Sequence, residues 1–354
     1  MPDGLVNESP FAAQELFLTD EDGRDLLVVV VKATYSIGAA GLHLASEPVP
    51  VDVAGTYHGD PETASLRFEP EIAPQKVGTD VVLVGHAFPN APGARWVDVG
   101  LRVGPLNKVI RAFGDRHWYR TLGFSRISEP ALFDRIPLRW ELAFGGWDRS
   151  DENPEQHRVE ARNPVGVGFQ ASLLAGAEEG TPLPNLEHPQ HLIDSPTDVP
   201  PPAGFGFIGP HWAPRLQYAG TYDAAWERDR LPLLPLDFDR RFYNAAPPDQ
   251  VLAEPLRGDE PVVVAHATPG PWLHFHLPGE PPPTSTVVIR RQADQALNLR
   301  LDTVIIDTDY LQVHLLWRAA LTVPQGPYAV QAIRVRPHPA STHAAPAQPL
   351  VSLS

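Results

Sequence analysis

Cysteine is absent from the 354-residue chain, and methionine occurs only once. Without cysteine the chain can form no disulfide framework, no thiolate metal site and no cysteine nucleophile. Small secreted proteins often depend on disulfides, whereas proteins of a reducing compartment do not. The composition is therefore typical of a protein that folds in the cytoplasm.

Long hydrophobic runs are also missing. The longest, LLVVVVKA from Leu26, is far shorter than the roughly 20 residues that span a bilayer, and Lys32 interrupts it. The first 25 residues are acidic and lack the positively charged start and apolar stretch of a secretory signal. We expect a soluble cytoplasmic protein with no membrane insertion.

Basic residues are outnumbered by acidic residues, 28 to 43, which gives a formal net charge of −15 with histidine neutral. A field of this sign repels nucleic-acid phosphates and anionic membranes. The charge therefore argues against a nucleic-acid partner and favours a protein or a small molecule.

Proline is present in excess, at 41 residues, or about twice the ~5% of average proteins. Proline and glycine together still stay below the ~25–30% that marks disordered low-complexity chains. Hydrophobic residues make up 43% of the chain, which is enough to form a core. We expect a folded protein with long, ordered, proline-stiffened loops.

Short runs of β-branched and aromatic residues, separated by Pro/Gly turns, indicate strands. In a first β-rich region, 25–146, the expected strands are 25–37, 79–88, 95–103, 107–114 and 136–146. In a second, 261–337, they are 260–268, 272–277, 285–291, 297–307 and 310–321. Closely spaced strands without βαβ alternation predict a mainly β fold with antiparallel sandwich- or barrel-like halves, long Pro-rich ordered loops and few short helices.

Three further stretches complete the expected organisation. Residues 1–24 form an N-terminal segment, and residues 338–354 form a tail that we expect to be disordered. Residues 147–260 lose periodicity but remain rich in aromatic side chains, in which disordered segments are poor. Within them a short helix is expected over 222–230, with Thr221 as its N-cap and Pro232 as its stop.

A metal site is the sharpest catalytic candidate. His274 and His276 lie two apart on an expected strand and so face the same side, and Glu280 follows. Two imidazoles and a carboxylate suit first-row metals. However, Leu277-Pro278-Gly279 breaks the strand before Glu280. Two histidines on a sheet face beside a turn are the favoured interpretation.

Other candidate motifs are weaker. GVGFQA, from Gly166, matches a dinucleotide-binding pattern, but Pro164 argues against the buried strand that must precede one. Asp237 and Asp239 could form an acid–base pair, but two arginines follow directly, and local salt bridging is the simpler account. The sequence shows neither a Gly-x-Ser-x-Gly elbow nor a phosphate-binding loop. We expect no enzyme activity, no cofactor and no metal.

Loops rich in aromatic residues, proline and arginine are what remain. Trp, Tyr and Arg carry much of the energy of protein interfaces, and proline lowers the entropy that a loop loses on binding. The clearest example is PLDFDRRFYNAAPPDQ, residues 235–250. These loops favour a protein-binding surface, while the alternative is that their aromatic residues form the core beneath.

A set of motifs then points to a family. LRWELAFGG, RNPVGVGF, LPNLE, PAGFGFI, PRLQYAGTYDAAW, LPLLPLDFDRRFYNAAPPDQ and WRA occur in this order. Together, over about residues 26–321, they resemble a bacterial family known as domain of unknown function number 2169. The resemblance implies a cytoplasmic adaptor, or chaperone, of type VI secretion that loads a PAAR-bearing effector onto the VgrG spike.

The resemblance supplies motif positions but no catalytic residues. We take six of these positions as candidate partner-binding residues: Arg162, Asn163, Phe242, Tyr243, Asn244 and Asp249. Two other functions stay open from the sequence. One is a metal-dependent enzyme that uses His274, His276 and Glu280, and the other is a structural part of the secretion machine.

Overall fold

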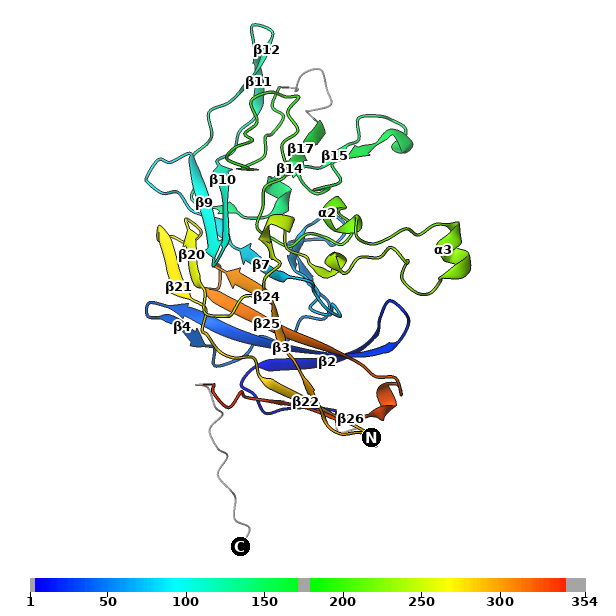
Figure 1. Cartoon of the computed structure of the whole chain (residues 1–354). Helices are drawn as coiled ribbons and strands as arrows, with labels where there is room; N and C mark the ends of the chain where they lie inside the picture. The colour runs from blue at the N-terminus through cyan, green and yellow to red at the C-terminus, as the bar shows by residue number, and fades with distance from the viewer. Residues whose placement is uncertain (1–3, 171–178, 342–354) are drawn as a thin grey trace.

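A seven-stranded sheet crosses the middle of the molecule (Figure 1). The structure is a computed structural model that describes residues 4–170 and 179–341. The strands of this sheet are β19 (Val251–Leu252), β7 (Thr79–Val84), β24 (Arg300–Asp307), β25 (Gln312–Thr322), β3 (Asp25–Gly38) and β2 (Ala12–Thr19), with β4 (Gly41–Leu44) paired to β3. Chain segments from the beginning and the end of the sequence therefore share one sheet.

Two further sheets pack against it. The five-stranded sheet comprises β18 (Leu186–Glu187), β10 (Leu106–Phe113), β9 (Trp96–Val103), β20 (Pro261–Ala265) and β21 (Trp272–His276). The four-stranded sheet comprises β1 (Leu5–Asn7), β26 (Val330–Arg336), β22 (Thr284–Ile289) and β23 (Gln295–Leu297). Both sheets contain strands from distant parts of the sequence, because β9 pairs with β20 and β1 pairs with β26.

The remaining elements are short. Two-stranded pairs are β11 (Trp118–Thr121) with β12 (Phe124–Ile127), β13 (Ile136–Pro137) with β8 (His86–Ala87), β14 (Phe144–Gly145) with β17 (Val167–Gly168), β15 (Trp147–Asp148) with β16 (Arg158–Val159), and β5 (Thr56–Tyr57) with β6 (Leu66–Phe68). The α-helices that the structure describes in full are α2 (Ala213–Leu216) and α3 (Ala224–Asp229). The 3-10 turns are η1 (Trp140–Leu142), η2 (Pro154–Gln156), η3 (Arg240–Tyr243), η4 (Pro248–Gln250) and η5 (Pro327–Ala329).

Strand β3 shows why the central sheet forms. Its run of valines and leucines is buried on both faces, as expected for a strand covered from two sides. Leu27, Val29 and Val31 face a core shared with the five- and four-stranded sheets. Val28 and Val30 face a second core, in which Phe207, Ala245 and Ala246 from the loop region are packed.

The mainly β prediction is confirmed, and the structure refines it. Pairing is largely antiparallel, but β24 and β7, β1 and β26, and β14 and β17 run parallel. The N-terminal segment contains β1 and β2, which the sequence analysis did not identify, and β26 was also missed. The strand expected over 136–146 is instead β13, η1 and β14, because Trp140–Leu142 makes a 3-10 turn.

The predicted N-cap of the short helix is wrong. Helix α3 begins two residues later than expected, and Asp223 rather than Thr221 is its N-cap, because the Asp223 carboxylate accepts a hydrogen bond from the Trp226 backbone N–H. Thr221 instead donates to Asp237. Of the tail predicted to be disordered, residues 342–354 lie outside the described residues.

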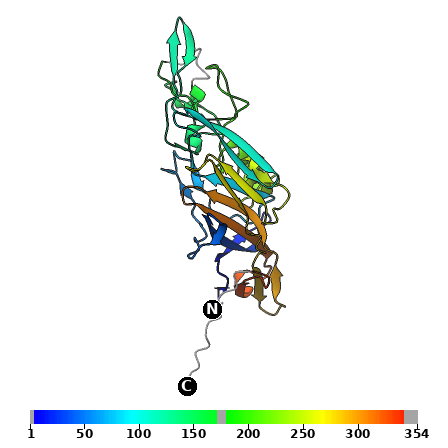
Figure 2. The same ribbon diagram turned by 90° about the vertical axis from the view of Figure 1, so that its left-hand side faces the viewer.

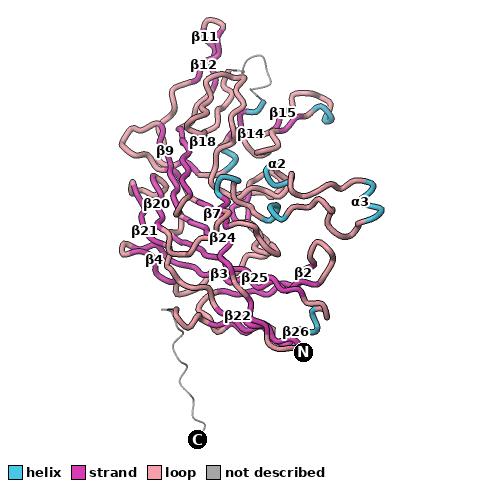
Figure 3. The backbone as a smooth tube through the Cα atoms, in the orientation of Figure 1, coloured by secondary structure: helices cyan, strands magenta, loops and turns pink. Residues whose placement is uncertain are grey.

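The molecule is elongated when seen from its side (Figure 2), with the β11–β12 hairpin at one end and the N-terminus toward the other. Loops surround the short helices on the side where α3 projects (Figure 3). In the described residues, no helix has the length and apolar character needed to cross a membrane.

Candidate functional site

Residues 235–250 form a layer over one face of the seven-stranded sheet. Residues 244–247 and Gln250 are buried, and the Gln250 amide donates to the backbone carbonyls of Val81 and Phe205 at 2.7 and 3.0 Å. The loop 69–76 lies beside this layer, since Arg240 donates to Gln75, and α2 contacts η3. We call residues 69–76, 213–215 and 237–250 together the loop platform.

A buried ion network fastens the platform to the sheet. Lys76 pairs with Glu69 and with Asp80, whose Oδ2 lies 2.7 Å from Lys76 Nζ. Asp80 also accepts hydrogen bonds from the Asn244 amide at 2.8 Å and from the Ala245 backbone N–H at 2.9 Å. Burial alone would lower the pKa of Lys76, but the two carboxylates outweigh it and raise that pKa. Lys76 is therefore charged and joins both platform loops to β7.

A second set of buried charges holds the loop 69–76 from the side of β25. Arg318 pairs with Asp302 at 2.6 Å and donates to the backbone carbonyls of Glu71 and Ala73. The Glu71 carboxylate lies 2.7 Å from Lys32 Nζ on β3, and burial raises its pKa. Because these partners lie on different strands, the loop is fixed at several points.

Arg215 links α2 to the rest of the platform. Its guanidinium donates to the backbone carbonyls of Ile208 at 2.8 Å and Phe242 at 3.1 Å. The same guanidinium lies 3.8 Å from Glu69. One buried arginine therefore contacts three separate segments of loop.

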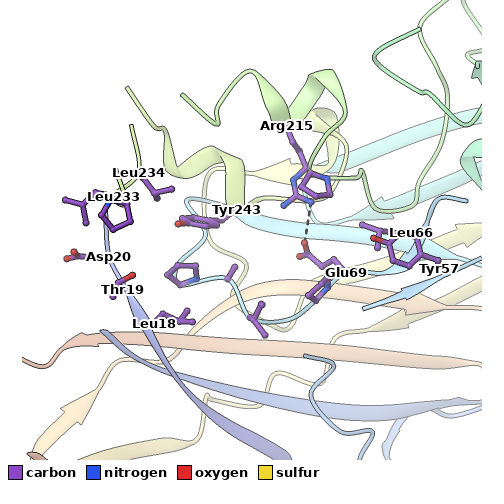
Figure 4. A pocket seen from close by; sticks show the side chains of 16 residues that line it. Leu18, Thr19, Asp20, Tyr57, Leu66, Glu69, Arg215, Leu233, Leu234 and Tyr243 are labelled. Carbon is purple, nitrogen blue, oxygen red and sulfur yellow. Dashed lines mark ion pairs between the residues drawn. The ribbon is translucent and has the colours of Figure 1, made fainter. Parts of the chain in front are cut away.

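A cavity of about 490 Å³ opens between the platform and the turn that follows β2. Figure 4 shows Tyr243 between Leu233 and Leu234 on one side and the Arg215–Glu69 pair on the other. Burial raises the pKa of Tyr243 to about 12, so its hydroxyl keeps its proton at neutral pH. The wall is mostly apolar, formed by Leu18, Tyr57, Leu66, Pro70, Ile72, Ala73, Pro74, Pro210, Pro232, Leu233 and Leu234.

A second cavity, of about 380 Å³, lies beside Asn244 and Arg215. It is lined mainly by aliphatic and proline side chains, with Arg241 at its edge. The Arg241 guanidinium stacks over Tyr218, 4.4 Å from the ring centroid, and pairs with Asp239. An apolar hollow with the Arg241 guanidinium in its lining suits a hydrophobic side chain next to a carboxylate.

An arm, residues 216–236, projects beside the platform and carries α3 (Figure 1). Leu216, Tyr222 and Leu231 are more than half exposed, and Leu236 is 87% exposed. The arm is tied down at the end of α3, because Arg230, the C-cap of that helix, donates to the Glu21 backbone carbonyl at 2.6 Å. Arg240 of the platform pairs with the carboxylate of the same Glu21. The molecule thus holds a group of exposed apolar side chains on an anchored support.

The two aspartates of LDFD serve local structure. Asp237 accepts hydrogen bonds from the Thr221 backbone N–H and hydroxyl, which lower its pKa. Asp239 caps η3 and pairs with Arg241, and these bonds lower its pKa. Both are ionised at neutral pH and already bonded. They therefore make no acid–base pair of opposite protonation states.

The six predicted positions are not brought together. Tyr243 lines the first cavity and Asn244 the second, and the Phe242 ring packs against Phe238 and Tyr243. Asn244 is buried, and its side-chain amide donates to the Gly78 backbone carbonyl and to the Asp80 carboxylate. Asp249 is exposed and pairs with Lys108 at 2.9 Å.

Arg162 and Asn163 line neither cavity. Arg162 pairs with its neighbour Glu160. Asn163 is fully buried and donates to the backbone carbonyls of Trp140 and Phe144. Its role is to fix the turn through η1 and β14, where Gly145 has a φ of +153° and no room for a side chain.

The alternative metal ligands are partly placed as predicted. His274 and His276 are both exposed on the same side of β21, with ring centroids 5.8 Å apart. Glu280 is buried and accepts a hydrogen bond from the Ser341 hydroxyl. Within residues 4–170 and 179–341, no three His, Asp or Glu side chains gather as a metal site would require.

The charges that build the platform, Glu69, Lys76, Asp80 and Arg215, were not predicted from the sequence. The available signal was Asp80 at the start of an otherwise apolar strand, TDVVLV, since a carboxylate there must have buried partners. Its partners lie up to 165 residues away in the chain. Sequence spacing does not reveal pairs of that separation.

Comparison with known proteins gives one family. No curated protein and no solved structure matches the chain. A family model described as "Uncharacterized protein conserved in bacteria (DUF2169)" matches residues 22–318. This match includes the central sheet from β3 to most of β25, the platform and the arm, so the chain belongs to the DUF2169 family.

Proposed function

We propose that this protein is a cytoplasmic adaptor of type VI secretion, which binds a PAAR-bearing effector and presents it to the VgrG spike. The motifs from about residue 26 to residue 321 support the secretion role through the resemblance they carry. The loop platform with its projecting arm is the observation that supports protein binding. The two lines of support are independent of each other.

The platform has the properties that a protein-binding surface needs. Its loops are fixed by buried ion pairs, so little conformational entropy remains to be lost when a partner binds. Exposed Leu236 and Tyr222 belong to the same arm as Leu233 and Leu234, which line the first apolar cavity, and that cavity can accept side chains of a partner. The effector is expected to contact the arm and to insert apolar side chains into the cavities.

Recovery of partners from the native bacterium is the direct test. The tagged protein is purified from cells that express the secretion system, and its partners are identified by mass spectrometry. The proposal expects a PAAR-bearing effector, together with VgrG. Recovery of neither component would overturn the adaptor function, and stable association with sheath or tube would indicate a structural part of the machine instead.

Variants of the exposed residues then test the surface. Leu236→Glu should weaken binding of the purified effector at least tenfold, because a charge replaces an apolar contact. Tyr328→Glu is the matched control, since Tyr328 is 88% exposed and lies in η5, directly before β26 of the four-stranded sheet. Equal affinities of the two variants would remove the arm from the interface.

The motif positions are tested in the same assay. Alanine at Phe242, Tyr243 and Asp249 should leave the protein folded and weaken effector binding. Asp249→Ala alone removes an exposed carboxylate that is also the ion-pair partner of the largely buried Lys108, so its urea midpoint is measured beside its affinity. Unchanged binding by a folded triple variant would exclude these three side chains from the contact.

A further inference from the structure

The β11–β12 hairpin ends in apolar side chains that the fold does not use. It projects from one end of the molecule (Figures 1 and 2). Leu122 is 94% exposed and Phe124 is 66% exposed. Side chains this exposed bury little surface, so the hydrophobic effect within this chain does not account for them. We call Leu122, Gly123 and Phe124, with Arg120 and Arg126, the hairpin tip.

The backbone of the tip also disfavours leucine. Leu122 has a φ of +49° and Gly123 a φ of +82°, as both central residues of a type I′ turn require. Asn, Asp and Gly are the residues that adopt this conformation readily, whereas a leucine is strained there. Leu311 also has a positive φ, but its carbonyl accepts the Ile37 N–H within the sheet. Leu122 is therefore both strained in its backbone and exposed in its side chain.

The charge of the hairpin opposes that of the whole chain. Residues 116–128 contain three arginines and no acidic residue, in a chain of net charge −15. Arg116 is buried against Glu187. Arg120 and Arg126 are exposed, and neither has an ion pair within the described part of the chain. Arg120 lies opposite Ser125, and Arg126 lies opposite Tyr119, the neighbour of Arg120. Because neighbouring residues of a strand face opposite sides, the two guanidiniums project from opposite faces of the hairpin.

The base of the hairpin is well anchored. A two-stranded hairpin alone is marginally stable in water. Here Trp118 is buried, its backbone N–H donates to the Thr181 carbonyl, and its backbone carbonyl accepts a hydrogen bond from the Gly180 N–H. The His117 N–H donates to the Ser128 hydroxyl, which closes the far end of the ladder. The tip is therefore presented in a defined position.

We propose that the hairpin tip docks into an apolar pocket rimmed by carboxylates on a protein partner. Leu122 and Phe124 enter the pocket, and Arg120 and Arg126 pair with the acidic rim on either side. A protein is favoured over an anionic membrane, because a net charge of −15 opposes approach to a charged bilayer and the tip holds only two cations. This surface is separate from the loop platform, and its argument does not depend on the proposed function.

In-cell photocrosslinking identifies the partner. A benzophenone amino acid replaces Phe124 in the native bacterium, and the same substitution at Tyr328 serves as the control. The proposal expects a crosslink specific to position 124 that maps to a protein segment containing Asp or Glu next to apolar residues. It also expects the crosslink to be lost when Arg120→Glu and Arg126→Glu are combined.

Binding of the purified partner then separates contact from folding. Leu122→Asn relieves the strained turn, so its Tm should equal or exceed that of the wild type while affinity falls at least tenfold. The double arginine reversal should also lower affinity at least tenfold, with a smaller loss at high salt. A lower Tm for Leu122→Asn would show that the leucine serves the fold, and would overturn the proposal.

Three other outcomes would overturn it as well. They are a crosslink no stronger than that at Tyr328, a crosslink to a second copy of this chain, and a crosslink that maps to a segment without acidic residues. Sedimentation with vesicles of phosphatidylcholine and phosphatidylglycerol (3:1) supplies the membrane control. Vesicle binding that depends on Leu122 and Phe124 would assign the tip to a lipid surface instead.

Discussion

The sheets and the loop platform are both ordered, but different interactions hold them. In the seven-stranded sheet, long backbone ladders pair β3 with β2 and β25, and the side chains between the sheets are apolar. In the platform, buried polar side chains bond to backbone groups of remote segments, as Asn244 does to Gly78 and Gln250 does to Val81. Both arrangements satisfy the polar groups of buried backbone.

The difference shows where each region is vulnerable. A ladder distributes its stability over many equivalent bonds, so one lost contact weakens it slightly. Where the platform meets the sheet, one side chain, such as Asp80 of β7, bonds to several partners at once. Removing such a residue leaves several buried groups unsatisfied, and each of those carries a desolvation penalty.

The largest effect is therefore expected from Asp80→Ala, which leaves the buried Lys76 with one carboxylate fewer. We expect a loss of about 3–5 kcal/mol in the free energy of unfolding, measured by urea denaturation. Asp98→Ala is the matched control, since Asp98 also lies on a strand and pairs with an arginine, Arg111, at a half-exposed site. Its loss should be about 1 kcal/mol or less. Similar losses for both variants would contradict the special role of the platform network.

A smaller effect is expected from Asn163→Ala, which removes two hydrogen bonds to buried carbonyls. We expect a loss of about 1–3 kcal/mol, because those carbonyls stay buried without their donor. Arg162→Ala changes the adjacent residue, whose pair with Glu160 is partly exposed, and should lose about 1 kcal/mol or less. If the arginine variant proved the less stable of the two, the turn would be held by charge rather than by the asparagine.

The pH dependence of stability tests the seven-stranded sheet, through the buried residue His314 on β25. Burial and the neighbouring Lys32 lower the pKa of His314 to about 3, so it is neutral in the folded protein. In the unfolded chain it takes up a proton below about pH 6.5, and stability falls as the pH falls from there. The slope is at most about 1.4 kcal/mol per pH unit.

His314→Gln should remove this dependence. Urea midpoints measured from pH 7 to pH 5 should fall less steeply for the variant than for the wild type. The buried carboxylates Glu69 and Glu71 are present in both proteins, so their contribution cancels in the difference between the two slopes. Parallel curves would mean that His314 takes up its proton equally in the folded and unfolded states.

Much of the fold follows from local sequence. The strand predicted over 25–37 is β3, and those predicted over 95–103 and 107–114 are β9 and β10 with ends shifted by one residue. Such apolar runs predict a buried strand, since a strand that is covered by other elements must be apolar. Strand β2 was missed because its edge position leaves charged and polar residues along AAQELFLT, and no buried pattern marks it.

The candidate site was predictable only in part. The segment 235–250 was identified as an ordered, proline-stiffened loop, and it is one. Which of its residues face outward was not predictable, because an aperiodic loop has no repeating face. Leu236 is 87% exposed while Asn244, eight positions on, is buried, although leucine is the more apolar residue.

The sequence by itself determined the composition-level properties: no cysteine chemistry, a strong negative charge, and strands wherever β-branched runs demanded burial. These depend on residue type and local period alone. The tertiary structure decided the rest, namely the partners of the buried charges, the two cavities and the exposed hairpin tip. The reason is physical, because the bonds of Asp80 to Ala245 and of Arg318 to Glu71 join segments that are far apart in the chain and meet only in the folded protein.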